Sequence, residues 1–173
     1  MDTQLVIKLS GLLVTVILTY TSTTINFSDD NTFPHVDDNL TLGDSIIAFA
    51  KTLEGLPYRQ GGCSSDRGFD CSGLVNYSYN AFKIKVGRSS REQALAGFAV
   101  KPDDARPGDI IVFARTPKGR VFHAGLVLTN ALDSLVILHA NERNGVHRTN
   151  VTISQYWNAK VNSIRRIERG VRP

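Results

Sequence analysis

The chain has 173 residues, enough for one domain that buries its own core plus an extension. Its hydrophobic content of 42% and charged content of 21% are ordinary for a globular protein and exclude bulk disorder. The net charge of +4 suits either a solvated surface or an anionic partner. The sequence has no run of Lys and Arg interleaved with aromatic residues, which argues against nucleic acid as that partner.

Residues 1–22 are predicted to be a signal peptide or an N-terminal anchor. The apolar run from Leu9 to Tyr20 follows Lys8 and is shorter than the about 20 residues that a membrane span needs. This pattern is typical of the hydrophobic region of a secretory signal peptide. If the apolar segment is counted as Leu5 to Tyr20, a retained N-terminal anchor is the alternative. Either reading predicts export to the periplasm or cell envelope, or secretion, with membrane contact only through an uncleaved segment.

The next segment, residues 23–39, is rich in Thr, Asn and Asp and is predicted to be a flexible tether. The folded domain is then expected to occupy residues 40–173. Its first element is a helix in "DSIIAFAKTLEG", where the apolar residues recur with helical spacing. We expect Asp44 to be the N-cap of this helix and Gly55 to end it.

A Gly-rich loop without periodicity, residues 56–70, leads into a second predicted helix over residues 71–82. Its apolar and small residues fall on one helical face: Cys71, Leu74, Val75, Ser78 and Phe82. Asp70 is a good N-cap, which places Cys71 in the first turn. A helix start favours a thiolate, but the charge of Asp70 opposes it, so a base is needed.

Because the chain has a second cysteine, Cys63, two roles other than nucleophile are possible for Cys71, namely a disulfide partner and a zinc ligand. A disulfide between them would suit an exported protein, but a bridge that closes so short a loop stabilises a domain little. Cys63 and Cys71 with His123 and His139 also have the count for a zinc site. No C-x-x-C or H-x-x-x-H spacing supports zinc, and we expect no metal and no cofactor.

The rest of the chain changes from helix to strand. A short helix is predicted in "SSREQALAG", where Ser89 and Glu92 form a capping box. β-Branched runs separated by tight turns then predict five strands: residues 109–114, 121–129, 134–141, 146–153 and 161–168. Helices followed by antiparallel strands predict an α+β domain with N-terminal helices packed on a small antiparallel sheet.

Two histidines stand out among the four. His123 begins one predicted strand and His139 ends the next, so the two side chains could face the same neighbour. Either one alone is more often a hydrogen-bonded core residue. With Cys71 they supply a nucleophile, a base and a group that orients the base. His147, beside a hairpin turn, is expected to be solvent-exposed, and His35, in the tether, is expected to have no functional role.

Several short motifs carry a resemblance to a known family. They are "GLPYRQGG", "GFDCSGLV", "GRSSREQ", "RPGDIIVF", "HAGLVL", "LHAN" and a later "YW". In this order and spacing, over about residues 44–167, they resemble the NlpC-like cell-wall cysteine peptidases. The resemblance implies a papain-like fold in which the helix bearing the cysteine packs on a small antiparallel sheet bearing the histidines.

The resemblance also implies a role for seven residues. Cys71 would be the nucleophile, His123 the general base and His139 the third polar residue. Tyr58 matches a family tyrosine that helps to stabilise the oxyanion. Three further residues match positions that in some members contact the N-terminal amine of a short peptide substrate: Asp70, Ser72 and Ser90.

The activity that the resemblance implies is hydrolysis of an amide bond in peptidoglycan stem peptides, between γ-D-glutamate and a diamino acid, by a monomer. Three alternatives remain open. They are an amidase that cuts the sugar–peptide bond, a thioester-forming acyltransferase, and a non-catalytic wall-binding domain. The last would normally have lost one member of the trio, and this chain keeps all three.

Overall fold

A computed structural model describes residues 7–9, 12–14, 41–116, 119–131 and 134–168. The chain divides into two compact units, Met1–Thr32 and Phe33–Pro173. In the first, strand β1 (Ile7–Leu9) pairs antiparallel with β2 (Leu12–Val14), inside the predicted signal peptide or anchor. The rest of that segment and the predicted tether at 23–39 lie outside the described residues. No helix among the described residues is long and apolar enough to cross a membrane.

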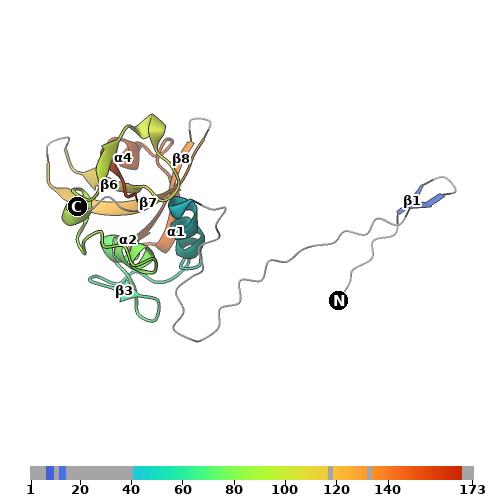
Figure 1. Cartoon of the computed structure of the whole chain (residues 1–173), viewed down its shortest axis with the longest axis horizontal. Coiled ribbons are helices and arrows are strands. Elements are labelled where there is room, and N and C mark those ends of the chain that lie inside the picture. The colour runs from blue at the N-terminus through green and yellow to red at the C-terminus, as the bar shows by residue number, and fades with distance from the viewer. Residues whose placement is uncertain (1–6, 10–11, 15–40, 117–118, 132–133, 169–173) are drawn as a thin grey trace. The chain divides into compact units, whose positions relative to one another are not determined.

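The second unit is built on a six-stranded antiparallel sheet with the order β5-β10-β6-β7-β8-β9 (Figure 1). Its strands are β5 (Phe98–Val100), β6 (Ile110–Ala114), β7 (Val121–Ala131), β8 (Ser134–Asn141), β9 (Gly145–Asn150) and β10 (Val161–Arg166). Neighbouring strands pair antiparallel throughout. The predicted α+β fold with a small antiparallel sheet is confirmed.

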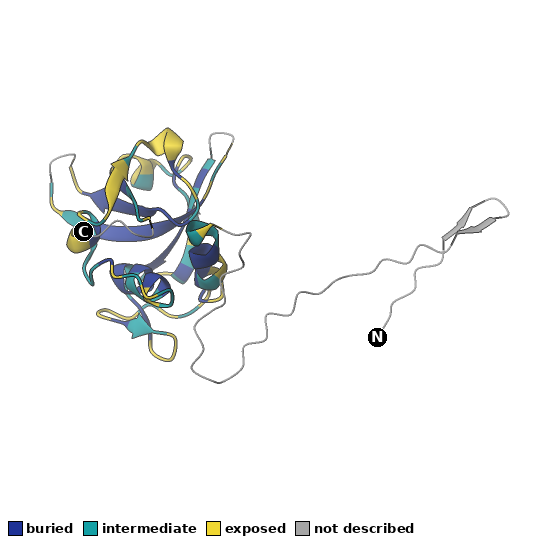
Figure 2. Cartoon of the chain, viewed as in Figure 1, coloured by how far each residue is buried: buried dark blue, intermediate teal, exposed yellow. Residues whose placement is uncertain are grey.

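Both faces of the sheet are covered, so its central strands are the most deeply buried part of the unit (Figure 2). Alternate residues of a strand point to opposite faces. On one face, Ile110 and Val112 join the core formed with the helices α1 (Leu42–Lys51) and α2 (Cys71–Asn80). On the other face, Ile111 and Phe113 join a second core.

The second core is closed by the short helix α4 (Gln155–Asn158), whose Trp157 packs against it. The structure also has a 3₁₀ turn, η1 (Pro102–Asp104), and the single-turn helix α3 (Ser90–Gln93). The predicted capping box of α3 is confirmed, because Ser89 and Glu92 hydrogen-bond each other's backbone N–H groups. The strand predicted over 146–153 ends earlier, at Asn150.

The prediction for the start of α1 is wrong. Thr41, not Asp44, is the N-cap, and Asp44 is the third residue of a capping box. The Thr41 hydroxyl accepts from the Asp44 N–H at 3.2 Å, and the Asp44 carboxylate accepts from the Thr41 N–H at 3.2 Å. Threonine and aspartate both cap helices, and here the pair divides the task. The helix ends at Lys51, before Gly55, which turns with φ of 87°.

The N-cap of α2 is the predicted Asp70, whose Oδ1 accepts from the Gly73 N–H at 2.6 Å. The helix ends at Asn80, two residues before the predicted end. The loop before it was expected to lack regular elements, but it contains a hairpin of two-residue strands, β3 (Cys63–Ser64) and β4 (Gly68–Phe69). This hairpin leads the chain into Asp70 and so fixes where α2 begins.

Candidate active site

Cys71 is the first residue of α2, and its thiol is half-buried and free. Burial raises the pKa of this thiol, and the charge of Asp70 adds to the effect. The backbone N–H groups of Ala124, Ser72 and Cys71 face the sulfur and act in the opposite direction, without outweighing burial. Ala124 follows His123 directly in β7, so the thiol lies beside that histidine's strand. At rest the thiol keeps its proton, and activating it requires a base.

His123 on β7 and His139 on β8 come together as the sequence predicts, because the two strands are neighbours. Nε2 of His123 lies 2.8 Å from Nδ1 of His139. His139 is fully buried and His123 is 7% exposed. Burial lowers the pKa of His123 to about 4, and it lowers the pKa of His139 still further, with His123 adding to the effect. Both rings are therefore neutral near pH 7, and Nδ1 is the ring nitrogen of His123 that does not contact His139.

Aromatic side chains enclose the histidine pair. The Trp157 ring of α4 lies 4.7 Å from the His123 ring and 5.0 Å from the His139 ring, between centroids. The Phe113 ring of β6 lies 5.9 Å from His123 and 4.9 Å from Trp157. This wall removes water from the pair, which is the physical reason that both pKa values fall. The motif "YW" singled out this tryptophan in the sequence but did not predict that it would pack against the histidines.

The prediction that His147 is a solvent-exposed residue is wrong. His147 is half-buried on β9, directly opposite His139 in the β8–β9 register, with the two rings 4.3 Å apart. Two residues on, Thr149 places its Oγ1 2.8 Å from Nε2 of His139. The period of two in a strand puts His147 and Thr149 on one face. Once the β8–β9 register places His147 opposite His139, the period of two along β9 brings Thr149 to the same face, and this is the signal that could have found it.

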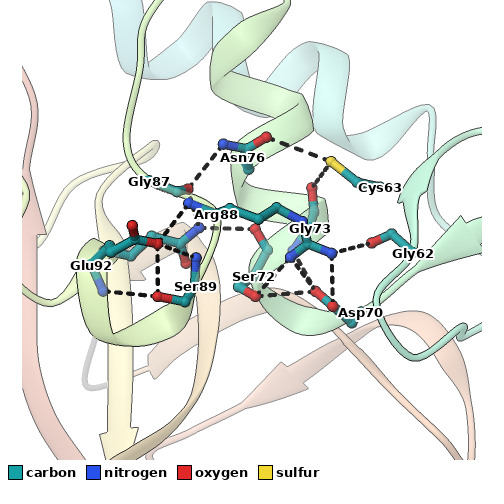
Figure 3. A network of polar contacts seen from close by, with 11 residues as sticks. Gly62, Cys63, Asp70, Ser72, Gly73, Asn76, Gly87, Arg88, Ser89 and Glu92 are labelled. Atoms are coloured by element: carbon teal, nitrogen blue, oxygen red, sulfur yellow. Dashed lines mark hydrogen bonds and ion pairs between the residues drawn. The ribbon is translucent and has the colours of Figure 1, made fainter.

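Asp70, the residue before Cys71, is held by Arg88, a residue that the sequence did not single out (Figure 3). Nη1 of Arg88 donates to Asp70 Oδ1 at 3.0 Å and Nη2 donates to Oδ2 at 2.8 Å. Nη2 also donates to the Gly62 carbonyl at 3.1 Å. Burial acts to raise the pKa of Asp70, but Arg88 and the Gly73 N–H hold it below its ordinary value. Asp70 is therefore ionised, with much of its charge offset by the guanidinium.

Of the other predicted contact residues, Ser72 belongs to this cluster and Ser90 does not, within the part of the chain that the structure describes. The Ser72 hydroxyl donates to Asp70 Oδ1 at 3.1 Å and accepts from Arg88 at 3.1 Å. Ser90 is the first residue of α3. Tyr58 is half-buried, and burial together with the nearby Cys71 raises the pKa of its hydroxyl. Its hydroxyl is thus a proton donor in the neighbourhood of the thiol.

The glycine of the "DCSG" motif has a packing role. A Cβ at Gly73 would collide with the carbonyl oxygen of Gly62, so only glycine lets the hairpin approach the first turn of α2. Gln93 of α3 holds the same turn from another side. It is fully buried, and its Nε2 donates to the Ser72 carbonyl at 2.8 Å. Two elements thus fix the helix start that carries Cys71.

Cys63 is a free thiol like Cys71, so the structure holds no bridge between them. Its sulfur lies 3.5 Å from the Gly73 carbonyl oxygen and 3.5 Å from Oδ1 of Asn76, and the one thiol proton is donated between these two acceptors. Burial raises the pKa of this thiol. Across the described residues, no group of three or more His, Cys, Asp and Glu side chains is arranged to hold a metal ion.

The buried histidines predict an acid-sensitive fold. Their pKa values lie below the ordinary 6.5, so from about pH 6.5 down towards pH 4 the unfolded chain binds more protons than the folded one. As the pH is lowered through this range, the free energy of unfolding should decrease by up to about 1.4 kcal/mol per pH unit for each buried histidine. Urea denaturation at a series of pH values measures this slope. His139→Gln should reduce it by about half, and an unchanged slope would contradict the assignment.

Removing Arg88 should make Cys71 harder to ionise. In Arg88→Gln the Asp70 charge is no longer offset, so the pKa of the Cys71 thiol should rise above its wild-type value. The rate of alkylation by iodoacetamide against pH, in a Cys63→Ser background, measures that pKa. Arg148→Gln is the matched control, because Arg148 pairs with Glu54 on the surface. A pKa that rises equally in both variants, or in neither, would contradict the role given to Arg88.

The comparisons with known proteins agree with this geometry. Residues 55–166 match the NlpC/P60 family. The chain is 36% identical over 132 residues to the gamma-DL-glutamyl hydrolase of Bacillus subtilis, aligned over 73% of this chain and 30% of that protein. It is 32% identical over 136 residues to the probable endopeptidase NlpC of Escherichia coli, aligned over 75% of this chain and 84% of that protein.

A crystal structure of an NlpC/P60 family protein from Bacillus cereus has the same fold, with a TM-score of 0.66 and 27% identity. The match covers 73% of this chain and 40% of that one. The chain thus spans less than a third of the Bacillus subtilis hydrolase and most of the Escherichia coli protein. The papain-like fold expected from the sequence is confirmed. The matched residues include the whole Cys71 helix and both buried histidines, and the chain belongs to the NlpC/P60 family.

Proposed function

We propose that this protein is a cysteine endopeptidase that hydrolyses an amide bond in peptidoglycan stem peptides. The observation that carries the proposal is the 2.8 Å contact between His123 Nε2 and His139 Nδ1, with the Cys71 thiol facing the N–H of Ala124 next to His123. A thiol, a neutral imidazole and a group that orients the imidazole are the requirements of nucleophilic acyl transfer.

In the proposed reaction, the Cys71 thiol gives its proton to Nδ1 of His123 as the sulfur attacks the amide carbonyl carbon. Because the pKa of the thiol is raised and that of the imidazole is lowered, the proton moves during the attack and not beforehand. The negative oxygen is stabilised by backbone N–H groups at the start of α2 and by the Tyr58 hydroxyl. One such donor can contribute about 3 kcal/mol to transition-state stabilisation.

The protonated His123 then gives its proton to the leaving amine, and a thioester remains on Cys71. Water, deprotonated by the same histidine, attacks the thioester carbonyl and releases the acid and the free thiol. His139 keeps the His123 ring in place through both half-reactions. Trp157, with Phe113 behind it, keeps bulk water away from the imidazoles, so the neutral base is preserved.

The proposed bond is the one between γ-D-glutamate and the diamino acid of the stem peptide. Support comes from the name of the Bacillus subtilis relative, a gamma-DL-glutamyl hydrolase. Such a substrate lies in the cell wall, so the proposal includes export. Residues 1–22 would act as the signal peptide or anchor, residues 23–39 as the tether, and residues 40–173 as the catalytic domain.

Two synthetic peptides test the bond. Both contain L-alanine, D-glutamate and L-lysine, but one joins lysine through the γ-carboxyl group and the other through the α-carboxyl group. We expect the wild-type chain to release lysine from the γ-linked peptide alone, and Cys71→Ala to release none from either. Equal cleavage of both peptides would contradict the γ specificity. Cleavage of a sugar–peptide bond in a muropeptide, with both peptides left intact, would indicate an amidase.

A further inference from the structure

The far side of His139, away from His123, carries a second hydrogen-bonded chain that the proposed mechanism does not use. Nε2 of His139 lies 2.8 Å from Oγ1 of Thr149. Oγ1 of Thr149 lies 3.4 Å from Nε2 of His147, and Nδ1 of His147 lies 3.0 Å from the carbonyl oxygen of Gly145. These residues come from β8 and β9, and the chain of contacts ends on a backbone group.

We propose that Thr149, backed by His147, is a positioning residue that fixes the tautomer of His139 and thereby leaves Nδ1 of His123 free to accept the Cys71 proton. The kinetic consequence rests on the proposed function. The tautomers themselves are a property of the folded protein without substrate.

The donor and acceptor of each hydrogen bond in this series can be assigned by starting from the last contact, between His147 and Gly145. The carbonyl of Gly145 can only accept, so Nδ1 of the His147 ring carries a proton and donates to it. In an imidazole whose single proton is on Nδ1, Nε2 is the acceptor. The amide nitrogen of Asn141, 3.4 Å away, can only donate, which agrees with that assignment. The proton of the Thr149 hydroxyl therefore points to Nε2 of His147.

With its proton directed to His147, the Thr149 oxygen is the acceptor for His139. Nε2 of His139 then carries that ring's proton, and Nδ1 of His139 is an acceptor. Nε2 of His123 must donate to it across 2.8 Å, so Nδ1 of the neutral His123 has no proton. The nitrogen that the reaction needs as a base is thus fixed by groups on β9.

The strength of the contacts decides which residue matters most. The His139–Thr149 contact of 2.8 Å is a good hydrogen bond, whereas the Thr149–His147 contact of 3.4 Å is long. Without the Thr149 oxygen, the Nε2–H of the buried His139 would lose its acceptor. The tautomer with the proton on Nδ1 then becomes competitive. In that tautomer His139 donates to His123, whose proton moves to Nδ1 and blocks the base.

The test compares Thr149→Val, which keeps the side chain's shape without a hydroxyl, with Thr149→Ser, which keeps the hydroxyl. We expect Thr149→Val to lower kcat by about tenfold with little change in KM, since one hydrogen bond to the base's partner is lost. Thr149→Ser should stay within about twofold of wild type. Thr129→Val is the matched control, an exposed strand threonine on β7 that should leave kcat unchanged.

Nitrogen-15 NMR of the histidine rings supplies a readout that a structural role alone would not move. In the wild-type protein we expect His139 to be protonated at Nε2 and His123 at Nε2. Thr149→Val should mix the tautomers and Thr149→Ser should restore them. A wild-type His139 protonated at Nδ1, or Thr149→Ser as impaired as Thr149→Val, would overturn the proposal. If the wild-type protein cleaves no stem peptide, the proposed function fails while the NMR result still decides the tautomer.

Discussion

Cys71→Ala is expected to abolish hydrolysis of the γ-linked peptide while leaving the fold intact. The change removes the sulfur, the only atom proposed to form a covalent bond with the substrate. His123 and His139 are proposed to act through that sulfur, so they cannot replace it. We expect kcat to fall by about 10⁴-fold or more, as for other nucleophiles of this kind. The thiol is half-buried, so the free energy of unfolding should change by about 1 kcal/mol or less. Chromatography of the peptide products and urea denaturation measure the two effects.

Cys63→Ser is the matched control for that experiment, because it changes the other free thiol eight positions away. The sulfur of Cys63 makes only long contacts, to Gly73 and Asn76 at 3.5 Å, and serine can replace them. We expect nearly wild-type activity. Turnover retained by Cys71→Ala would contradict the assignment of the nucleophile. A loss of activity in Cys63→Ser as large as in Cys71→Ala would show that the two thiols act together.

His123→Ala is expected to lower kcat by about 10³-fold, since the thiol then keeps its proton and the leaving amine has no acid. The variant also empties part of the space between Phe113 and Trp157, so we expect about 2 kcal/mol of lost stability as well. Chemical rescue separates the two effects. Free imidazole added to the folded variant should restore part of the rate if the space admits it, without changing the urea midpoint.

His35→Ala is the control for that loss, because it removes a histidine from the segment predicted to precede the domain. It should change neither rate nor stability. A folded His123→Ala variant with a wild-type rate would contradict the role of His123 as base. A rate loss that is repaired by stabilising the fold, and not by imidazole, would mean that the ring acts through packing.

The electrostatics of the site distinguish it from a preformed ion pair. Burial raises the pKa of the thiol and lowers the pKa of both imidazoles, so all three groups are neutral at rest. The carboxylate of Asp70, the residue before Cys71, is ionised, and Arg88 offsets its charge.

The sequence predicted those parts of the site that depend on local pattern. Asp70 and the residues after it have the cap and the periodicity of a helix start, so the place of Cys71 in the first turn was predictable. The β-branched runs placed His123 and His139 on successive strands. Successive antiparallel strands joined by a short turn are neighbours, so their proximity followed. The motifs added the expected fold and roles.

Other parts depend on contacts that no local pattern encodes. The strands β3 and β4 have two residues each, too few to show a period of two. The pairing of Arg88 with Asp70 joins a loop to a helix start across the fold. The turn beside His147 favours an exposed side chain. The register of the hairpin instead places it opposite His139. Thr149 could be found only once that register was known.

The most direct test of the central claim is mass spectrometry of stem peptides in purified peptidoglycan after incubation with the full chain, wild type beside Cys71→Ala. We predict peptides that end in D-glutamate with the wild-type protein, together with the matching fragments that begin with the diamino acid. Neither should form with Cys71→Ala. Intact muropeptides with both proteins, or the same products with both, would contradict a thiol peptidase centred on Cys71.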